Sequence, residues 1–399
     1  MFHPMYLGLF ILLGIFALGD IIGILTKSRL SSVFVALMTF LVLFMAGVIP
    51  PDLIDRAQFT GLTRFAMVFL VFHMGTSISV QQLIKEWKVL VLAALSCVAT
   101  MAGVFVAMPL IGRPAVFVSV PIINGGIIAT QIMTEAAMNQ GFTMAAALGT
   151  LIFVVQRFVG TVPASICATN EANLVLAEFR AKKAEGINLL ELEKEAEKGE
   201  ESQSVKKEPL WHKVDKYWTS YVVLGVVASF GLLGNYLGNV TPIPLSIWAL
   251  ILGVVAAQLG LVPPNVLDKG KATGIFMVAT FASLIPALAT ITPGDLLQLG
   301  YELAIVFGFA LVGVYVCMIL LPAWKLIGSK NLTVGIAMAQ LLAFPATFLI
   351  VNEVATGLAQ NEDEKQYVVK KLTPAFVVSG FVSVTSLSVI VAGIFAAIM

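Results

Sequence analysis

Ten stretches of apolar residues, most of them about twenty residues long, constrain this sequence more than any other feature. An α-helix crosses the hydrocarbon core of a bilayer with roughly 20 apolar residues. The stretches cover residues 5–26, 31–49, 65–78, 89–111, 142–168, 217–237, 243–262, 273–291, 302–326 and 372–398. Charged residues make up only 12% of the chain, whereas a soluble domain has roughly 25%. We therefore expect an all-α polytopic membrane protein with ten transmembrane helices.

Composition and motifs exclude several classes of function. Lys and Arg number 24 and Asp and Glu number 23, so there is no basic excess for nucleic acid. The three cysteines, Cys97, Cys167 and Cys317, are far apart in the sequence and have neither a metal-ligand spacing nor a disulfide framework. We find no nucleotide-binding loop and no nucleophile motif. We therefore expect membrane lipid as a partner, no nucleic acid and no enzymatic activity.

The basic residues predict the orientation of the chain, because loops rich in Lys and Arg stay on the cytoplasmic side. With the N-terminus outside, ten spans place nearly all basic residues inside. The exceptions are Arg56, Arg64 and Arg113 outside and Arg157 within a span. This predicts a multi-pass protein of the cell (inner) membrane with both termini outside and a cytoplasmic connector at residues 169–216. The dense mixture of Lys and Glu there favours a solvated segment over a regulatory or partner-binding one.

Two further apolar stretches contain too many interruptions to be simple spans. Residues 115–133 have Pro121 and the pair Gly125 and Gly126 near their middle, and residues 332–351 contain Gln340 and Pro345. Non-helical backbone at membrane depth is tolerated only where it is buried in protein or lines a cavity. We therefore interpret both stretches as re-entrant hairpins.

The two halves of the chain repeat the same order of elements. Residues 1–168 hold five spans and the first hairpin, and residues 217–399 hold five spans and the second hairpin. A faint similarity between residues 78–90 and 291–303, at constant offset, supports the repeat. Because each half has an odd number of spans, the halves are predicted to be inverted relative to each other. Inverted repeats with interrupted helices at matching positions are typical of secondary transporters, whose site lies between them.

The hairpins supply most of the candidate ligands. A broken helix frees backbone groups: half-helix N-termini suit a carboxylate, whereas carbonyls and hydroxyls suit sodium (Na+). The candidates for substrate binding are Asn124, Gly125, Gly126, Arg157, Gln340, Pro345 and Thr347. The candidates for ion binding are Thr130, Gln131, Glu135, Asn352 and Glu353. We identify no resident metal site.

Several titratable side chains leave alternatives open. Arg157 lies deep in a span, where a charge costs on the order of 3 kcal/mol, so it either clamps an anionic substrate or pairs with Glu135. Glu135 and Glu353 follow the two hairpins and either neutralise a cation, carry a coupling proton, or mark helix ends in water. For His73 a hydrogen-bonded position in the core is favoured over a proton relay.

Four local stretches resemble the glutamate:sodium symporter family. They are the small-residue run at residues 71–78, the hairpin at 124–130, the span end at 160–164 and the second hairpin at 342–347. The likeness covers most of the chain, although both hairpins contain fewer glycines than those of the family. Gln156 and Arg157 also stand where the family tends to have small residues.

The resemblance implies a homodimeric, elevator-like carrier coupled to sodium, with glutamate as the first candidate among small anionic substrates. The alternative is a proton-coupled carrier, or an exporter, of another organic anion or amino acid. A channel or sensor scaffold is disfavoured, because hairpins entering from opposite sides suit alternating access better than a continuous pore.

Overall fold

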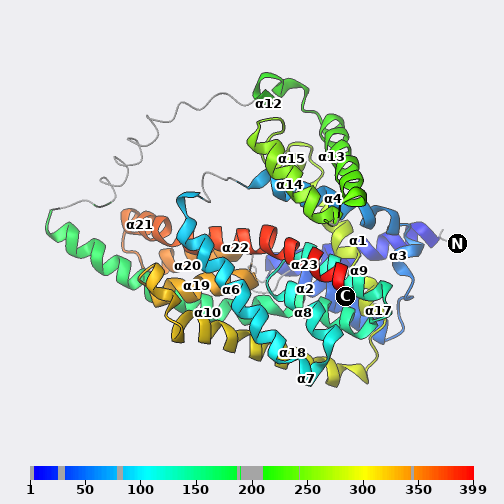
Figure 1. Cartoon of the computed structure of the whole chain (residues 1–399), viewed down its shortest axis with the longest axis horizontal. Helices are drawn as coiled ribbons and strands as arrows, with labels where there is room; N and C mark the ends of the chain where they lie inside the picture. Colours follow the sequence, from blue (N-terminus) through cyan, green and yellow to red (C-terminus); the bar gives the residue numbers. More distant parts are fainter. Residues whose placement is uncertain are drawn as a thin grey trace.

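Helices account for all the regular secondary structure in the described part of the chain. The computed structural model describes residues 4–25, 32–78, 84–186, 189, 210–241, 243–342 and 346–399 (Figure 1). No strand occurs in these ranges. This agrees with the all-α fold that the apolar stretches predict.

The two halves each contain long helices joined by short ones. The helices of the first half are α1 Pro4–Leu25, α2 Ser32–Met45, α3 Leu53–Arg56, α4 Thr60–Ser77, α6 Trp87–Val106, α7 Met108–Ile111, α8 Arg113–Ile123, α9 Ile127–Asn139 and α10 Thr143–Ala184. The second half begins with α12 Leu210–Lys213, η1 Asp215–Tyr217, α13 Ser220–Val240, α14 Leu245–Gln258, α15 Val266–Lys269, α16 Thr273–Ala282, α17 Ile285–Ala289, α18 Asp295–Tyr315, η2 Val316–Leu320 and η3 Ala323–Leu326. It continues with α19 Lys330–Leu342, α20 Ala346–Leu358, α21 Glu362–Thr373, η4 Pro374–Val378, α22 Ser379–Val382, η5 Ser383–Leu387 and α23 Ser388–Ile398.

Several helices are long and apolar enough to cross a membrane. Within the described ranges there are five of these: Pro4–Ile22, Trp87–Val106, Thr143–Ala184, Ser220–Val240 and Asp295–Leu320. Shorter apolar helices lie between and after them, among them α2, α8, α14, α20 and α23. The chain is therefore a helical protein with several helices suited to a membrane, as its hydropathy predicts.

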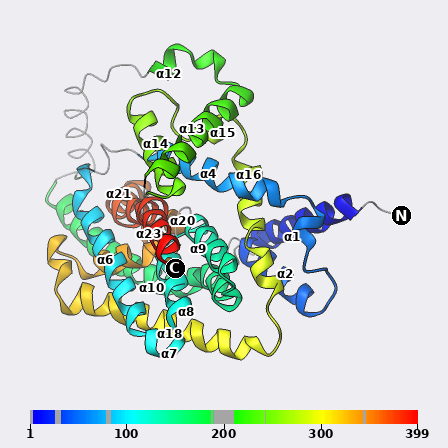
Figure 2. The ribbon, with the colours of Figure 1, turned by 45° about the vertical axis from the view of Figure 1, so that its right-hand side comes forward.

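Packing partners recur between the halves. Helix α4 packs against α14, and α17, at the position in the second half that corresponds to α4, packs against α2. Helix α6 packs against its own counterpart α18. Figures 1 and 2 show α12–α15 on one side of the molecule and α1–α3 on another, while α6, α8, α10 and α18–α23 form the body between them.

Glycine pairs bring the backbones of these helices into direct contact. At the crossing of α6 and α18, a Cβ on Gly313 would lie 2.3 Å from the Ala99 carbonyl oxygen, and one on Gly103 would lie 2.2 Å from that of Phe309. Gly75 and Gly253 do the same at the crossing of α4 and α14. Small residues at such crossings favour helix association in a membrane, because they let the backbones approach closely.

This contact predicts different effects for the same substitution at two positions in α18. Gly313→Ala is expected to destabilise the fold by about 1–3 kcal/mol, because the methyl group forces two backbones apart. Gly308 has open space around its Cα, so Gly308→Ala is expected to be neutral or to stabilise the helix by about 1 kcal/mol. Thermal unfolding of the purified variants in detergent measures both effects. Equal melting temperatures for the two variants would contradict the close crossing.

Helix α10 extends well past the predicted end of its span at residue 168. Its last turns pack against α21, where the rings of Phe179 and Tyr367 lie 4.9 Å apart. Arg180 donates to both carboxylate oxygens of Glu364, from Nε at 2.9 Å and from Nη2 at 2.7 Å. Residues 169–184 therefore continue α10 as a helix, of which one side packs on α21 while most of the other side chains are exposed. Residues 190–209 of the predicted connector lie outside the described residues.

The Arg180–Glu364 pair predicts a pH-dependent stability. Hydrogen bonds from Arg180 lower the pKa of Glu364 below its ordinary value of 4.5. The stabilisation is therefore complete above that value and is lost as the pH falls through the lowered pKa. We expect Glu364→Gln to lower the melting temperature by a constant amount between pH 6 and 7, and by progressively less below pH 4.5.

Glu178→Gln, at an exposed position in the same helix, is the matched control and should leave the melting temperature unchanged throughout. A difference between wild type and Glu364→Gln that does not shrink in acid would show that the ion pair is not the stabilising contact.

Candidate functional site

The first interrupted stretch contains a break between α8 and α9. The helix ends at Ile123, and Asn124 donates from Nδ2 to the Val120 carbonyl oxygen at 2.9 Å. Gly126 then adopts an extended conformation before α9 begins. A Cβ on Gly126 would lie 2.4 Å from Val384 Cγ1, and one on Gly125 would lie 2.7 Å from Ser388 Cβ. The two glycines therefore allow the break to pack directly on the C-terminal helical segment, at η5 and α23.

The second interrupted stretch packs against the same helix, one turn earlier. Helix α19 ends at Leu342 and α20 begins at Ala346; Pro345, a predicted substrate ligand, lies outside the described residues. A Cβ on Gly380 would lie 3.1 Å from Thr347 Cγ2 and 3.1 Å from the Ala339 carbonyl oxygen. Both breaks thus converge on residues 380–388, which belong to the opposite half of the chain from the first break.

Helix α10 contacts both breaks. Gln156 donates from Nε2 to the carbonyl oxygen of Gly125 at 3.0 Å. One turn later, a Cβ on Gly160 would lie 2.8 Å from Leu341 Cβ, just before the second break. The hydrogen bond from Gln156 satisfies a carbonyl that the interrupted helix leaves without an intrahelical donor.

Gln340 ties the second break to α6. Its Oε1 accepts a hydrogen bond from Ser96 Oγ at 2.9 Å and one from Cys97 Sγ at 3.3 Å. Its Nε2 donates to Thr100 Oγ1 at 2.7 Å. All of these side chains are buried, so the network fixes the orientation of the amide in an apolar surrounding.

Four buried oxygens around the breaks have no hydrogen-bond partner within the part of the chain that the structure describes. They are Asn124 Oδ1, Gln156 Oε1, Thr347 Oγ1 and Ser383 Oγ. An unpaired polar group in an apolar interior costs about 1–3 kcal/mol, so such atoms normally meet water, an ion or a ligand. All four are neutral oxygens, a donor set that suits a hard monovalent cation such as sodium.

The structure brings together five of the seven predicted substrate ligands, and Pro345 lies outside the described residues. Asn124, Gly125, Gly126, Gln340 and Thr347 all lie at the two breaks, as described above. Arg157 directly follows Gln156 in α10, and its guanidinium lies 5.8 Å from the centre of the Phe153 ring, one turn earlier in the same helix. The described residues contain no ion pair between Arg157 and Glu135.

The predicted ion ligands are also divided. Thr130 donates to the Gly126 carbonyl oxygen at 3.0 Å and so lies at the first break. Gln131 and Glu135 lie farther along α9, on the wall of a cavity. In the second half Asn352 donates to the Phe348 carbonyl oxygen, and Glu353 is exposed. His73 accepts a hydrogen bond from the Leu267 amide at Nδ1, which agrees with the core position favoured for it.

Sequence reasoning missed several polar residues at the breaks. Ser96, Thr100 and Ser383 stand in apolar spans, where single hydroxyl residues usually bond to their own helix. Gln156 carried a stronger signal, because an amide deep in a span needs a partner. Two serines of the last span, at positions 379 and 383, lie one turn apart on the same helix face and could also have indicated a polar contact.

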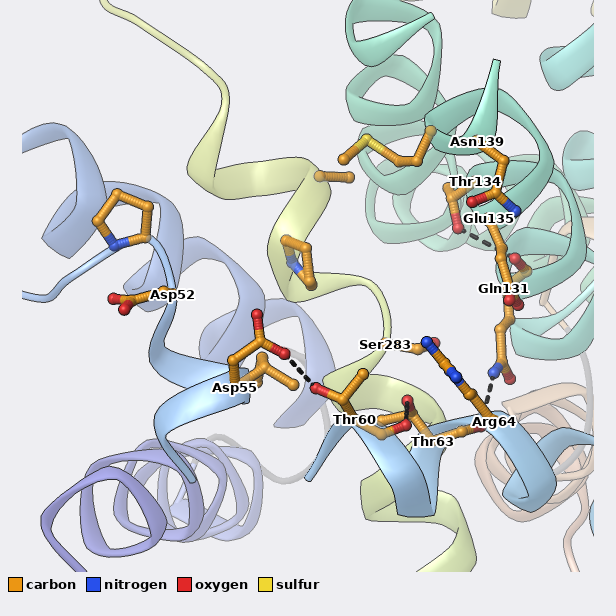
Figure 3. A pocket seen from close by; sticks show the side chains of 15 residues that line it. Asp52, Asp55, Thr60, Thr63, Arg64, Gln131, Thr134, Glu135, Asn139 and Ser283 are labelled. Atoms are coloured by element: carbon orange, nitrogen blue, oxygen red, sulfur yellow. Dashed lines mark hydrogen bonds between the residues drawn. The ribbon is translucent and has the colours of Figure 1, made fainter. Parts of the chain in front are cut away.

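A cavity of about 290 Å³ lies where α3, α4, α9 and α17 meet (Figure 3). Its walls carry charged and polar side chains, among them Asp55, Arg64, Gln131 and Glu135. Helix α9 connects this cavity to the first break, because it begins at the break and presents Gln131 and Glu135 at the cavity one and two turns later.

The sequence was compared with protein-family models and with curated proteins, and neither comparison found a match.

The hydrogen bond from Gln156 to the first break can be tested by substitution. Gln156→Leu leaves the Gly125 carbonyl oxygen buried and without its donor, so we expect a loss of about 1–3 kcal/mol in the free energy of unfolding. Gln140→Leu makes the same change at an exposed position and should have little effect. Chemical denaturation in mixed micelles measures both. A Gln156→Leu variant as stable as Gln140→Leu would mean that the break does not depend on this bond.

Proposed function

We propose that this protein is a secondary active transporter that carries a small anionic substrate, with glutamate as the first candidate, in symport with sodium. One observation carries the proposal: helix breaks at matching positions of the two halves converge on one helix, where four buried oxygens have no hydrogen-bond partner among the described residues. Discontinuous helices that meet between repeats are the usual site of substrate and coupling ion in secondary transporters.

In this proposal the chain crosses the inner membrane ten times, in two inverted halves of five spans. The stretches around the two breaks are re-entrant hairpins that enter from opposite sides, both termini lie outside, and the connector lies in the cytoplasm. The recurring packing of α4 on α14 and of α2 on α17 supports the repeat. The chain acts as a homodimer in which the body that holds the breaks moves against the peripheral helices, in an elevator-like alternating-access cycle.

We assign sodium and the substrate carboxylate to different groups at the breaks. The amide and hydroxyl oxygens of Asn124, Gln156, Thr347 and Ser383 would coordinate sodium. The N-terminal ends of α9 and α20 carry free N–H groups and positive partial charge, which favour the carboxylate of the substrate. Arg157, one residue after Gln156, is positioned on the same helix to contribute to anion binding when the breaks rearrange.

Sodium is favoured over protons as the coupling ion by the donor set. A coupling proton needs a titratable group whose burial brings its pKa into the working range. Glu135 and Glu353, the two carboxylates that follow the breaks in the sequence, are both exposed. The four oxygens at the breaks belong to amide and hydroxyl side chains, which can coordinate sodium but do not take up a proton.

Transport by reconstituted vesicles tests the proposal. Glutamate uptake should follow an imposed inward sodium gradient and should be absent with a proton gradient alone. Gly126→Ala should reduce uptake at least tenfold, because its methyl group would lie 2.4 Å from Val384 Cγ1 and displace the break. Gly14→Ala, where the added Cβ meets no neighbour, should transport like the wild type. Uptake that is independent of sodium would exclude the proposed coupling.

A further inference from the structure

The cavity between α3, α4, α9 and α17 contains two opposite charges that have no ion-pair partner in the part of the chain that the structure describes. Asp52 at its rim is bound to Arg56 at 2.8 Å, and this hydrogen bond lowers the pKa of Asp52. Asp55 accepts a hydrogen bond from the Thr60 hydroxyl. Arg64 and Glu135 also line the cavity, and neither has an ion-pair partner among the described residues.

Gln131 adds a buried acceptor to the same cavity. The side chain is 1% exposed, and its Nε2 donates to the Thr63 carbonyl oxygen at 3.1 Å. That bond leaves Oε1 as the free end of the amide, and no described residue donates to it. Figure 3 shows the Arg64 side chain extending from α4 into the cavity, with Gln131 and Glu135 on the α9 side. The amide therefore forms an inner part of the cavity wall, with its oxygen enclosed by protein.

We propose that this cavity is a binding site for a small zwitterion, namely an α-amino acid. Its carboxylate pairs with the guanidinium of Arg64, whose planar fork matches a carboxylate. Its ammonium group binds the carboxylate of Glu135, which is exposed on the cavity wall. The site lies one to two turns along α9 from the first break and is distinct from it, so the proposal goes beyond transport and stands without it.

The charges and the volume of the cavity favour a small zwitterion over a metal cation, a simple anion or a large amino acid. A simple metal cation would meet the positive charge of Arg64, and a simple anion would meet the carboxylates of Asp55 and Glu135. A zwitterion presents each charge to its opposite. The volume of about 290 Å³ is at the lower end of ligand pockets, which span roughly 300–1,000 Å³, so a small amino acid such as alanine fits better than a large one.

Binding of radiolabelled L-alanine to the purified full-length protein in detergent tests the site. Arg64→Gln and Glu135→Gln should each weaken binding at least tenfold, because each removes one charge-assisted contact. Propionate, which lacks the ammonium group, and ethylamine, which lacks the carboxylate, should compete at least tenfold less well than unlabelled alanine. Arg64 and Glu135 are exposed, so both variants should keep the wild-type melting temperature.

Two control substitutions and the Gly126→Ala variant distinguish binding in this cavity from binding at the helix breaks. Arg113→Gln and Glu353→Gln make the same changes at exposed positions outside the cavity and should bind alanine like the wild type. Gly126→Ala, which displaces the first break, should also retain alanine binding, whatever its effect on glutamate uptake. The proposal is overturned if Arg64→Gln and Glu135→Gln bind normally, if propionate or ethylamine competes as well as alanine, or if Gly126→Ala alone abolishes binding.

Discussion

The structure depends on how two interrupted helices are accommodated inside an apolar body. A helix break frees peptide groups that hydrocarbon cannot satisfy, so each break must find its partners within the protein. At the first break this is done by Gln156, which donates to the Gly125 carbonyl oxygen, and by glycines that let the backbone approach η5 and α23. Near the second break the side chain of Gln340, two residues before the end of α19, is held by three side chains of α6.

The two breaks pack on the same helical segment near the C-terminus. Four buried side-chain oxygens around them have no hydrogen-bond partner among the described residues. The break of the first half packs on residues 384–388, and the break of the second half packs on Gly380. The π-helical turns η4 and η5 flank this region, and π-helical turns inside α-helices are frequently found at functional sites. A site built from both halves in this way can respond to a movement of either, which is what alternating access requires.

Much of this arrangement could be predicted from particular residues. Gly125, Gly126 and Asn124 indicated a break, because few other residues interrupt an apolar helix at its centre, and the structure has a break at that position. Gln340 and Thr347 were expected at the second break, and both are buried there. The burial of Phe179 could not be predicted, because Tyr367 of α21, which lies against it, is distant in the sequence.

Other features depend on contacts between segments that are distant in the sequence. Ser383 reads as an ordinary hydroxyl in a span, and only the packing of the first break on η5 gives it importance. The cavity is formed by four elements, and nothing in the sequence places Arg64 of α4 beside Gln131 of α9. The partner of Arg157 was equally open from the sequence, which offers Glu135 by proximity, whereas the described residues show the guanidinium against Phe153.

The length of helix α10 links contacts that lie far apart in the molecule. A continuous helix of 42 residues is about 63 Å long at a rise of 1.5 Å per residue, roughly twice the thickness of the hydrocarbon core. One part of this rod contacts both breaks, through Gln156 and Gly160, and its far end is held by Glu364 of α21. Bending is easiest at Pro163, which lacks an amide hydrogen. The breaks and the Arg180–Glu364 pair are therefore joined through one helix, and Pro163, which lies between them, decides how far a displacement at one would reach the other.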